Sequence, residues 1–352
     1  MLLIEKVDKV RLPKRYHAVN NICAYIYDHL TEVLSDPYYS QMSQTTFEFG
    51  EDEEFQQIVK QSKVHIIDAL KTANKKAELE TVLTKHLVMS IVSDMTNFIY
   101  ESIKIAQKGK MSVAFALVRK PFTDQLLILE QILIDKTDFI NRFFHNGNPQ
   151  DYDPSSNKLD KAMIIEAAIL KLRFPIFQPK FIHELRYDKS SKLSINWISN
   201  HALHIVTNDK NYKTENQNLN FVFSVPEDIE SYWHHFFLAI PILLIYTSSI
   251  VDKIIFEIID DKDNRKELRQ LQRLIGLMMS FERVQKSRMS TSLFSIISKA
   301  IVTECGICKH KNRFKKHDFK LFFYQEIFLC SKCFNPIKLH EDGIKNLSKI
   351  LG

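Results

Sequence analysis

Glycine is scarce in this chain, with seven residues among 352. Tight hairpins and phosphate-binding loops depend on glycine, because its backbone enters conformations that other residues rarely adopt. So few glycines disfavour both a protein of many hairpins and one built around such a loop. Apolar residues make up 45% of the chain, enough for a sizeable core. The composition therefore predicts a mainly α fold.

Hydrophobic periodicity gives the helical body its outline. We expect helices over 16–35, 51–75, 77–108, 114–135, 160–173 and 226–260, and a pair of helices over 264–300. Segments 36–50 and 146–158 are predicted loops, and 188–225 fits either two short strands or a helix end followed by a loop. We divide the chain into an N-terminal helical region (1–110), a central helical domain (111–262), a helical connector (263–300) and a C-terminal module (301–352).

Segment 114–135 carries two charges on a strongly apolar helix. Arg119 and Glu130 are three turns apart and could share one face, so each is expected to pair with the other or with a neighbouring helix. Pro121 predicts a kink or a new first turn between them.

The most apolar segment is 236–251, which is interrupted by Pro241. A membrane span usually needs about 20 apolar residues, so we expect a buried central helix and no membrane partner. The first residues show no secretory signal pattern, and four of the five cysteines form CxxC pairs. Both features indicate a cytoplasmic protein whose cysteines bind metal.

The CxxC pairs are Cys305 with Cys308 and Cys330 with Cys333. Two such turns aim four thiolates at one point, and residues 303–337 resemble a C4 zinc ribbon. A site filled by four cysteines has no position for a catalytic water, so the Zn²⁺ is expected to be structural. Segment 318–330 is predicted to be strand, making the module β-rich. The alternatives for these four cysteines are an iron–sulfur cluster and a redox dithiol. The fifth cysteine, Cys23, is expected in the core of the helical body.

Positive charge concentrates in the same module. Residues 301–352 hold ten Lys/Arg against five Asp/Glu, a balance of +5 out of +6 for the chain. A local basic patch is typical of polyanion binding, although a solvated lysine-rich surface has the same composition. The predicted nucleic-acid contacts are Lys309, Lys311, Arg313, Lys315, Lys316 and Lys320. The interleaved aromatic residues either stack on bases or, as we expect, form the module's small core.

The body contains no recognised phosphate-binding, hydrolase or metalloprotease motif. Arginine, histidine and acidic residues are densest around Arg186, His201 and His204. These three residues could catalyse an acid–base reaction. The alternatives are a second metal site, or polar side chains that are hydrogen-bonded within a helical core. A further nuclease alternative is the D-x-K pattern at Asp260–Lys262, which requires a preceding strand.

Residues 80–260, with an Arg/Glu helix followed by a histidine-containing segment, resemble HEPN-type helical domains of bacterial toxin and antiphage proteins. That resemblance implies metal-independent RNA cleavage. The family's Arg-x(4–6)-His motif is matched by Arg11 and His17, which lie outside this region and flank Pro13.

Three functions fit these features. The first is a cytoplasmic protein whose ribbon binds nucleic acid or a nucleic-acid-bound partner, in bacterial antiphage defence by analogy. The second is a HEPN-like ribonuclease or toxin. The third is a homo-oligomeric assembly protein whose ribbon docks other proteins.

Overall fold

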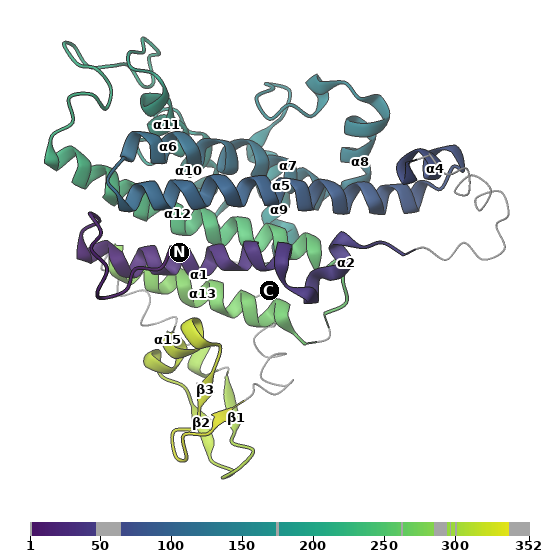
Figure 1. Ribbon diagram of the computed structural model, residues 1–352, viewed down its shortest axis with the longest axis vertical. Helices are drawn as coiled ribbons and strands as arrows, with labels where there is room; N and C mark the ends of the chain where they lie inside the picture. The colour runs from purple at the N-terminus through teal and green to yellow at the C-terminus, as the bar shows by residue number, and fades with distance from the viewer. Residues whose placement is uncertain are drawn as a thin grey trace.

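The mainly α fold is confirmed in the computed structural model, which describes residues 2–46, 65–173, 176–261, 263–284, 294–295, 297–299 and 301–337. The long helices α1, α5, α12 and α13 run side by side, and the C-terminal module lies beneath them (Figure 1). In the part of the chain that the structure describes, strands occur only in that module.

The first half of the body contains the helices α1 (Lys14–Ser35), η1 (Pro37–Tyr39), α2 (Ser40–Ser43), α4 (Ile66–Thr72), α5 (Lys76–Gln107), α6 (Met111–Arg119), η2 (Lys120–Gln125), α7 (Leu126–Ile134) and α8 (Lys136–Ile140). The second half contains η3 (Asn141–Asn146), η4 (Pro149–Asp151), α9 (Lys161–Leu172), α10 (Pro179–Tyr187), α11 (Ile195–Leu203), α12 (Pro226–Ile255) and α13 (Arg265–Val284).

The predicted helices at 16–35, 77–108, 160–173 and 226–260 correspond to α1, α5, α9 and α12. Residues 51–64 of the helix predicted over 51–75 lie outside the described residues, and α4 is its described end. Segment 188–225 is a helix end followed by a loop, the second of the two predicted alternatives, because α11 is followed by turns and not by strands.

Helix α12 forms the centre of the body and contacts α1, α7, α9 and α13. It is long and apolar enough to cross a membrane, but 89% of its most apolar window is buried inside the protein. The expected buried central helix is thus confirmed. One hydrophobic cluster extends from the N-terminal segment through α12 to the C-terminal module.

A buried ion pair joins three helices around a π-helical turn. Arg186 of α10 and Glu130 of α7 are both fully buried, with Nη1 and Oε1 2.5 Å apart. The hydroxyl of Tyr246 on α12 donates to the same carboxylate oxygen at 2.6 Å. The turn η2 supplies carbonyls: Phe122 O accepts from Arg186 Nε at 2.6 Å, and Thr123 O accepts from the Tyr187 hydroxyl at 2.5 Å.

Glu130 therefore pairs with a neighbouring helix, one of the two expected outcomes, and not with Arg119. The turn η2 contains Pro121 and has a wider, π-type winding, so α7 is rotated relative to the register of one continuous α-helix. Burial acts to lower the pKa of Arg186, but the combined effects of Glu130, Tyr187 and Tyr246 raise it above its ordinary value. The buried guanidinium is thus held in its ionised form.

A second buried polar cluster lies where α13 meets α12 and α1. Asp252 of α12 pairs with Arg273 and, at 3.1 Å, with the Nε atom of Arg269. Arg269 also donates to the backbone carbonyl of His29. Burial, together with the nearby positive charges of Arg269 and Arg273, holds the pKa of His29 well below its usual value.

Candidate metal centre

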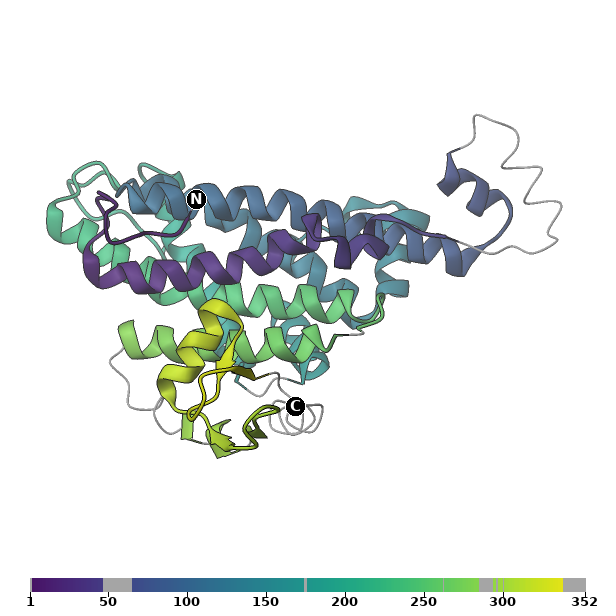
Figure 2. The ribbon, with the colours of Figure 1, turned by 60° about the horizontal axis from the view of Figure 1, so that its bottom comes forward.

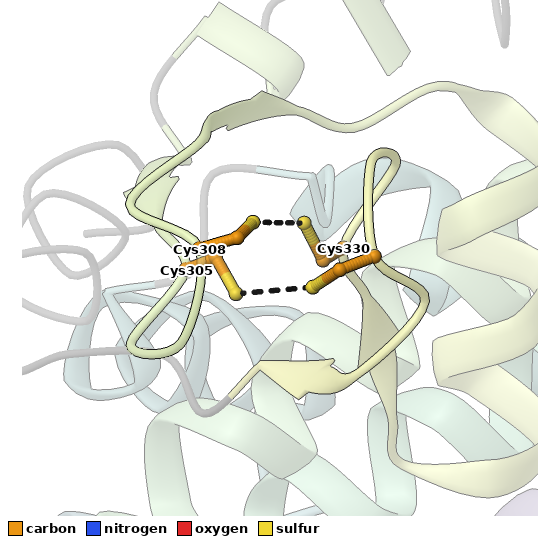
Figure 3. A group of neighbouring side chains, drawn as sticks. Cys305, Cys308 and Cys330 are labelled. Atoms are coloured by element: carbon orange, nitrogen blue, oxygen red, sulfur yellow. Dashed lines mark hydrogen bonds between the residues drawn. The ribbon is translucent and has the colours of Figure 1, made fainter.

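The four cysteines of the CxxC pairs come together in the C-terminal module. Their Sγ atoms all lie within 4.8 Å of one another, with Cys305 to Cys333 and Cys308 to Cys330 at 3.6 Å (Figure 3). A disulfide needs a separation of about 2.05 Å, so these sulfurs are not bonded. A tetrahedral ion with metal–sulfur bonds of about 2.3 Å places its ligands about 3.8 Å apart. The four cysteines could therefore hold one metal ion.

The two cysteine turns have the same backbone geometry. Cys305 N donates to His310 O and Cys330 N donates to Asn335 O, each at 2.9 Å. In each turn the fifth residue, Lys309 or Phe334, donates its N–H back to the carbonyl of the first cysteine and has a positive φ, of 55° and 60°. Positive φ is uncommon for residues other than glycine. The sequence folds this way locally because each turn closes two backbone hydrogen bonds around its thiols.

Amide groups surround the sulfurs and link the two turns. Asn312, on β2, is buried; its Oδ1 accepts from Ser331 N at 2.8 Å and its Nδ2 points at Cys330 Sγ, 3.7 Å away. Asn335 Nδ2 lies 3.4 Å from Cys333 Sγ. Such outer contacts orient metal ligands. Neither asparagine was predicted from the sequence; the position of Asn335, two residues after a cysteine, was the available signal.

These donors also affect the thiols' acidity. Burial acts to raise the pKa of Cys330, but backbone N–H groups of Cys333 and Lys332 lower it to about 6. Hydrogen bonds from Asn335 lower the pKa of Cys333. A thiolate is the form that binds metal, so both groups are prepared for ligation.

The module contains two short sheets and one helix. Strand β1 (Val302–Glu304) pairs antiparallel with β2 (Lys311–Arg313), and β3 (Phe328–Leu329) pairs with β4 (Pro336–Ile337). The strand predicted over 318–330 is wrong for most of its length, because α15 (Lys316–Gln325) occupies it. Asp318 starts this helix by accepting from Lys315 N at 2.7 Å, and the module is less β-rich than expected.

Most aromatic side chains of the module form its core, as expected. Phe314, Phe319, Phe322 and Phe323 are buried, and Phe328 stacks on Phe314 with ring centroids 4.1 Å apart. Phe334 is the exception among the module's described aromatic residues, since 74% of its surface is exposed. The buried phenylalanines are therefore unavailable for base stacking, Tyr324 is half-buried, and Phe334 is exposed.

Helix α15 attaches the module to the body, beside α13 (Figure 2). Phe323 packs against Gly276 of α13, where a Cβ atom would lie 2.8 Å from the ring. Tyr324 packs edge-on against Tyr25 of α1 at 5.0 Å. Gln272 of α13 donates to the Glu326 carboxylate at 3.0 Å. The module is thus docked on α1 and α13 by aromatic packing and a side-chain hydrogen bond.

The six basic residues predicted to bind nucleic acid fall into two groups. Lys316 and Lys320 reach Glu282 of α13 and help attach the module. The other four are exposed, and the described residues provide no ion pair for any of them: Lys309, Lys311, Arg313 and Lys315. We call these four the basic face. Lys311 and Arg313 project from the same side of β2, with Asn312 pointing inward.

The predicted catalytic residues occupy different surroundings. Arg186 is fully buried in the ion pair with Glu130, and neither His201 nor His204 is among its described hydrogen-bond partners. His201 is half-buried on α11 with its ring 4.1 Å from that of Trp197, while His204 is exposed at the end of the helix. In the D-x-K pattern, Lys262 lies outside the described residues, and the end of helix α12 followed by a turn at 256–259 occupies the place of the required strand.

Comparison with protein-family models, curated proteins and solved structures finds no match to this chain. The resemblance to HEPN-type domains therefore has no support from a family match. What the chain does must be argued from the geometry of its sites.

Proposed function

We propose that the C-terminal module is a zinc ribbon that binds nucleic acid through the basic face. Cys305, Cys308, Cys330 and Cys333 would hold one Zn²⁺ ion, whose part is to fix the two turns relative to each other. A complete set of four thiolates favours zinc in a structural role, because no ligand position is left for substrate. The sulfur separations of 3.6 Å support one tetrahedral ion.

The nucleic-acid proposal rests on one observation: some basic residues of the module pair with an acid, and others do not. Two cations neutralise Glu282, but the basic face has four exposed cations without acidic partners among the described residues. Folding does not use these charges, so they are available to phosphates, which dominate nucleic-acid affinity. The exposed ring of Phe334, in the second cysteine turn, offers a surface on which one base could stack.

The experiment measures binding of a fluorescent duplex and a single strand by anisotropy across a range of salt concentrations, after metal analysis of the purified protein. We expect one zinc per chain. The variant Lys311→Gln/Arg313→Gln should weaken binding and reduce the slope of log affinity against log salt by about 1.8 for duplex DNA, since each phosphate contact contributes about 0.9.

The matched control is Lys316→Gln/Lys320→Gln, which removes the same charge from the same module at residues engaged with Glu282. It should leave the salt slope nearly unchanged. Equal losses in both variants would mean that net charge alone matters. Removing the metal with a chelator should abolish binding and reduce the helical signal of α15, whereas a metal-free protein with full affinity contradicts the role given to zinc.

The antiphage role, the cytoplasmic location, the ribonuclease alternative and the homo-oligomeric alternative stay predictions. The resemblance and composition that suggested them concern the body and the chain as a whole, and the basic face carries no argument for any of them.

A further inference from the structure

A cleft of about 460 Å³ lies at the opposite side of the body from the ribbon, between α11, the loop 204–225 and the start of α12. Figure 1 shows this loop extending beyond α11 and α6, away from the C-terminal module. Small-molecule sites typically enclose about 300–1,000 Å³. The cleft is therefore large enough for a compact organic ligand.

The loop that forms one wall is held by its own hydrogen bonds. Asn220 N donates to Ile205 O and Thr214 N donates to Thr207 O, each at 2.9 Å. The indole Nε1 of Trp197, on α11, donates to Asn211 O at 3.1 Å and ties the loop to the helix. These bonds give the cleft a defined shape.

Aromatic rings line both sides of the cleft. On one side Trp197 packs on His201 at 4.1 Å, and Tyr212 lies 6.0 Å from the same imidazole. On the other side Phe221 stacks on Tyr232 with centroids 4.4 Å apart and planes 24° apart. Phe221 has a φ of 61°, a conformation uncommon for a bulky residue. Flat rings that line a cleft suit a planar heterocycle.

Positive charge dominates the rim. Lys192, Lys210 and Lys213 line the cleft, are exposed, and form no ion pair with any residue that the structure describes. Two acids, Asp228 and Glu215, also line the cleft, so the three lysines leave a net charge of +1. Asp228 also accepts a hydrogen bond from the N–H of Val225 at the start of α12. The excess of cations selects an anionic ligand.

We propose that this cleft binds a nucleoside phosphate, with the base against the aromatic rings and the phosphates among the three lysines. Aromatic stacking accepts any base because each base has a π-face, and lysine contacts phosphate as a mobile point charge. The same chemistry is presented by a free nucleotide and by one nucleotide of a single strand. The site is independent of the ribbon and of the basic face.

The chain contains two tryptophans, and only Trp197 lines the cleft. Trp233 is buried and donates its indole N–H to Ala106 O. Titrating the full-length protein with ATP should quench tryptophan fluorescence in a saturable manner, and Trp197→Phe should remove that change. Lys210→Gln/Lys213→Gln should weaken the affinity about tenfold, as expected for the loss of two exposed charge contacts.

The matched control is Lys171→Gln/Lys180→Gln, which removes two exposed lysines outside the cleft and should retain full affinity. Inorganic triphosphate should compete weakly, because it lacks a base. Quenching by ATP assigns a free nucleotide. Quenching by oligoadenylate alone, retained in Lys311→Gln/Arg313→Gln, assigns a nucleotide within a strand. The proposal is overturned if neither ATP nor oligoadenylate quenches the fluorescence. It is also overturned if Lys210→Gln/Lys213→Gln binds ATP as tightly as the wild type, or if inorganic triphosphate binds as tightly as ATP.

Discussion

The buried pair of Arg186 and Glu130 allows a quantitative test by the substitution Glu130→Gln. Glutamine has nearly the same volume as glutamate, so the change opens no cavity; it removes the negative charge and replaces one carboxylate oxygen by an amide NH2 group. The guanidinium would then remain fully buried with no carboxylate beside it. Removing one partner of a buried ion pair typically costs about 3–5 kcal/mol. We expect a cost near the lower end, about 3 kcal/mol, because the amide oxygen can still accept one hydrogen bond.

The assay is urea unfolding followed by tryptophan fluorescence, since both tryptophans lie in the body and report its transition without the ribbon. The change in the free energy of unfolding follows from the shift in midpoint and the slope. The control is Lys136→Gln, which breaks an exposed pair with Glu80 whose lysine side chain is 53% exposed. Exposed pairs contribute about 0–1 kcal/mol, so this variant should differ little from the wild type.

A loss of stability in Glu130→Gln no larger than that in Lys136→Gln would contradict the role given to this buried pair. A second variant separates the charge effect from general damage to the core. Glu130→Gln/Arg186→Met removes the uncompensated cation and should recover part of the lost stability, because an apolar replacement of a buried pair is often tolerated. A double variant less stable than Glu130→Gln would assign the loss to packing instead.

Two further predictions concern the module's attachment and the response to acid. Gly276→Ala should destabilise docking of α15 by about 1–2 kcal/mol, because the new Cβ would lie 2.8 Å from the Phe323 ring. In a Phe323→Leu background the same change should stabilise the protein, because alanine has a higher helix propensity than glycine. Protection of the module from protease digestion measures both effects. The pKa of His29 is lowered by folding, so below about pH 6.5 the unfolded chain binds a proton at this imidazole that the folded chain does not bind. The contribution of His29 to stability is therefore present above that pH and is lost as the pH falls toward the folded pKa. The variant His29→Gln should reduce this acid sensitivity in urea unfolding at successive pH values, and an unchanged pH profile would contradict the prediction.

The sequence predicted the parts of this protein that depend on local pattern. Periodic apolar residues identified α1, α5 and α12, and the spacing of the cysteines identified the four residues that come together in the module. Each depends on residues close in the chain, where helix period and turn geometry decide the outcome.

The sequence failed where distant residues decide. Helix α15 was predicted as strand because its aromatic residues suit either structure, and its buried face is defined by contact with Gly276 on α13. Glu130 was paired with Arg119 as one possibility from helical spacing, but its partner Arg186 is 56 residues away. The loop at 204–225 shows no periodicity, so the cleft that it forms with α11 could not be anticipated from the pattern.

The buried pair also limits how this protein can change over evolutionary time. Arg186, Glu130 and Tyr246 come from α10, α7 and α12, and each satisfies a group on another helix. Loss of the acid alone leaves a buried cation, and loss of the arginine alone leaves a buried anion, so single substitutions pass through an unstable intermediate. In an alignment of related chains, these positions are expected to covary: arginine, glutamate and tyrosine retained together, or replaced together by apolar residues.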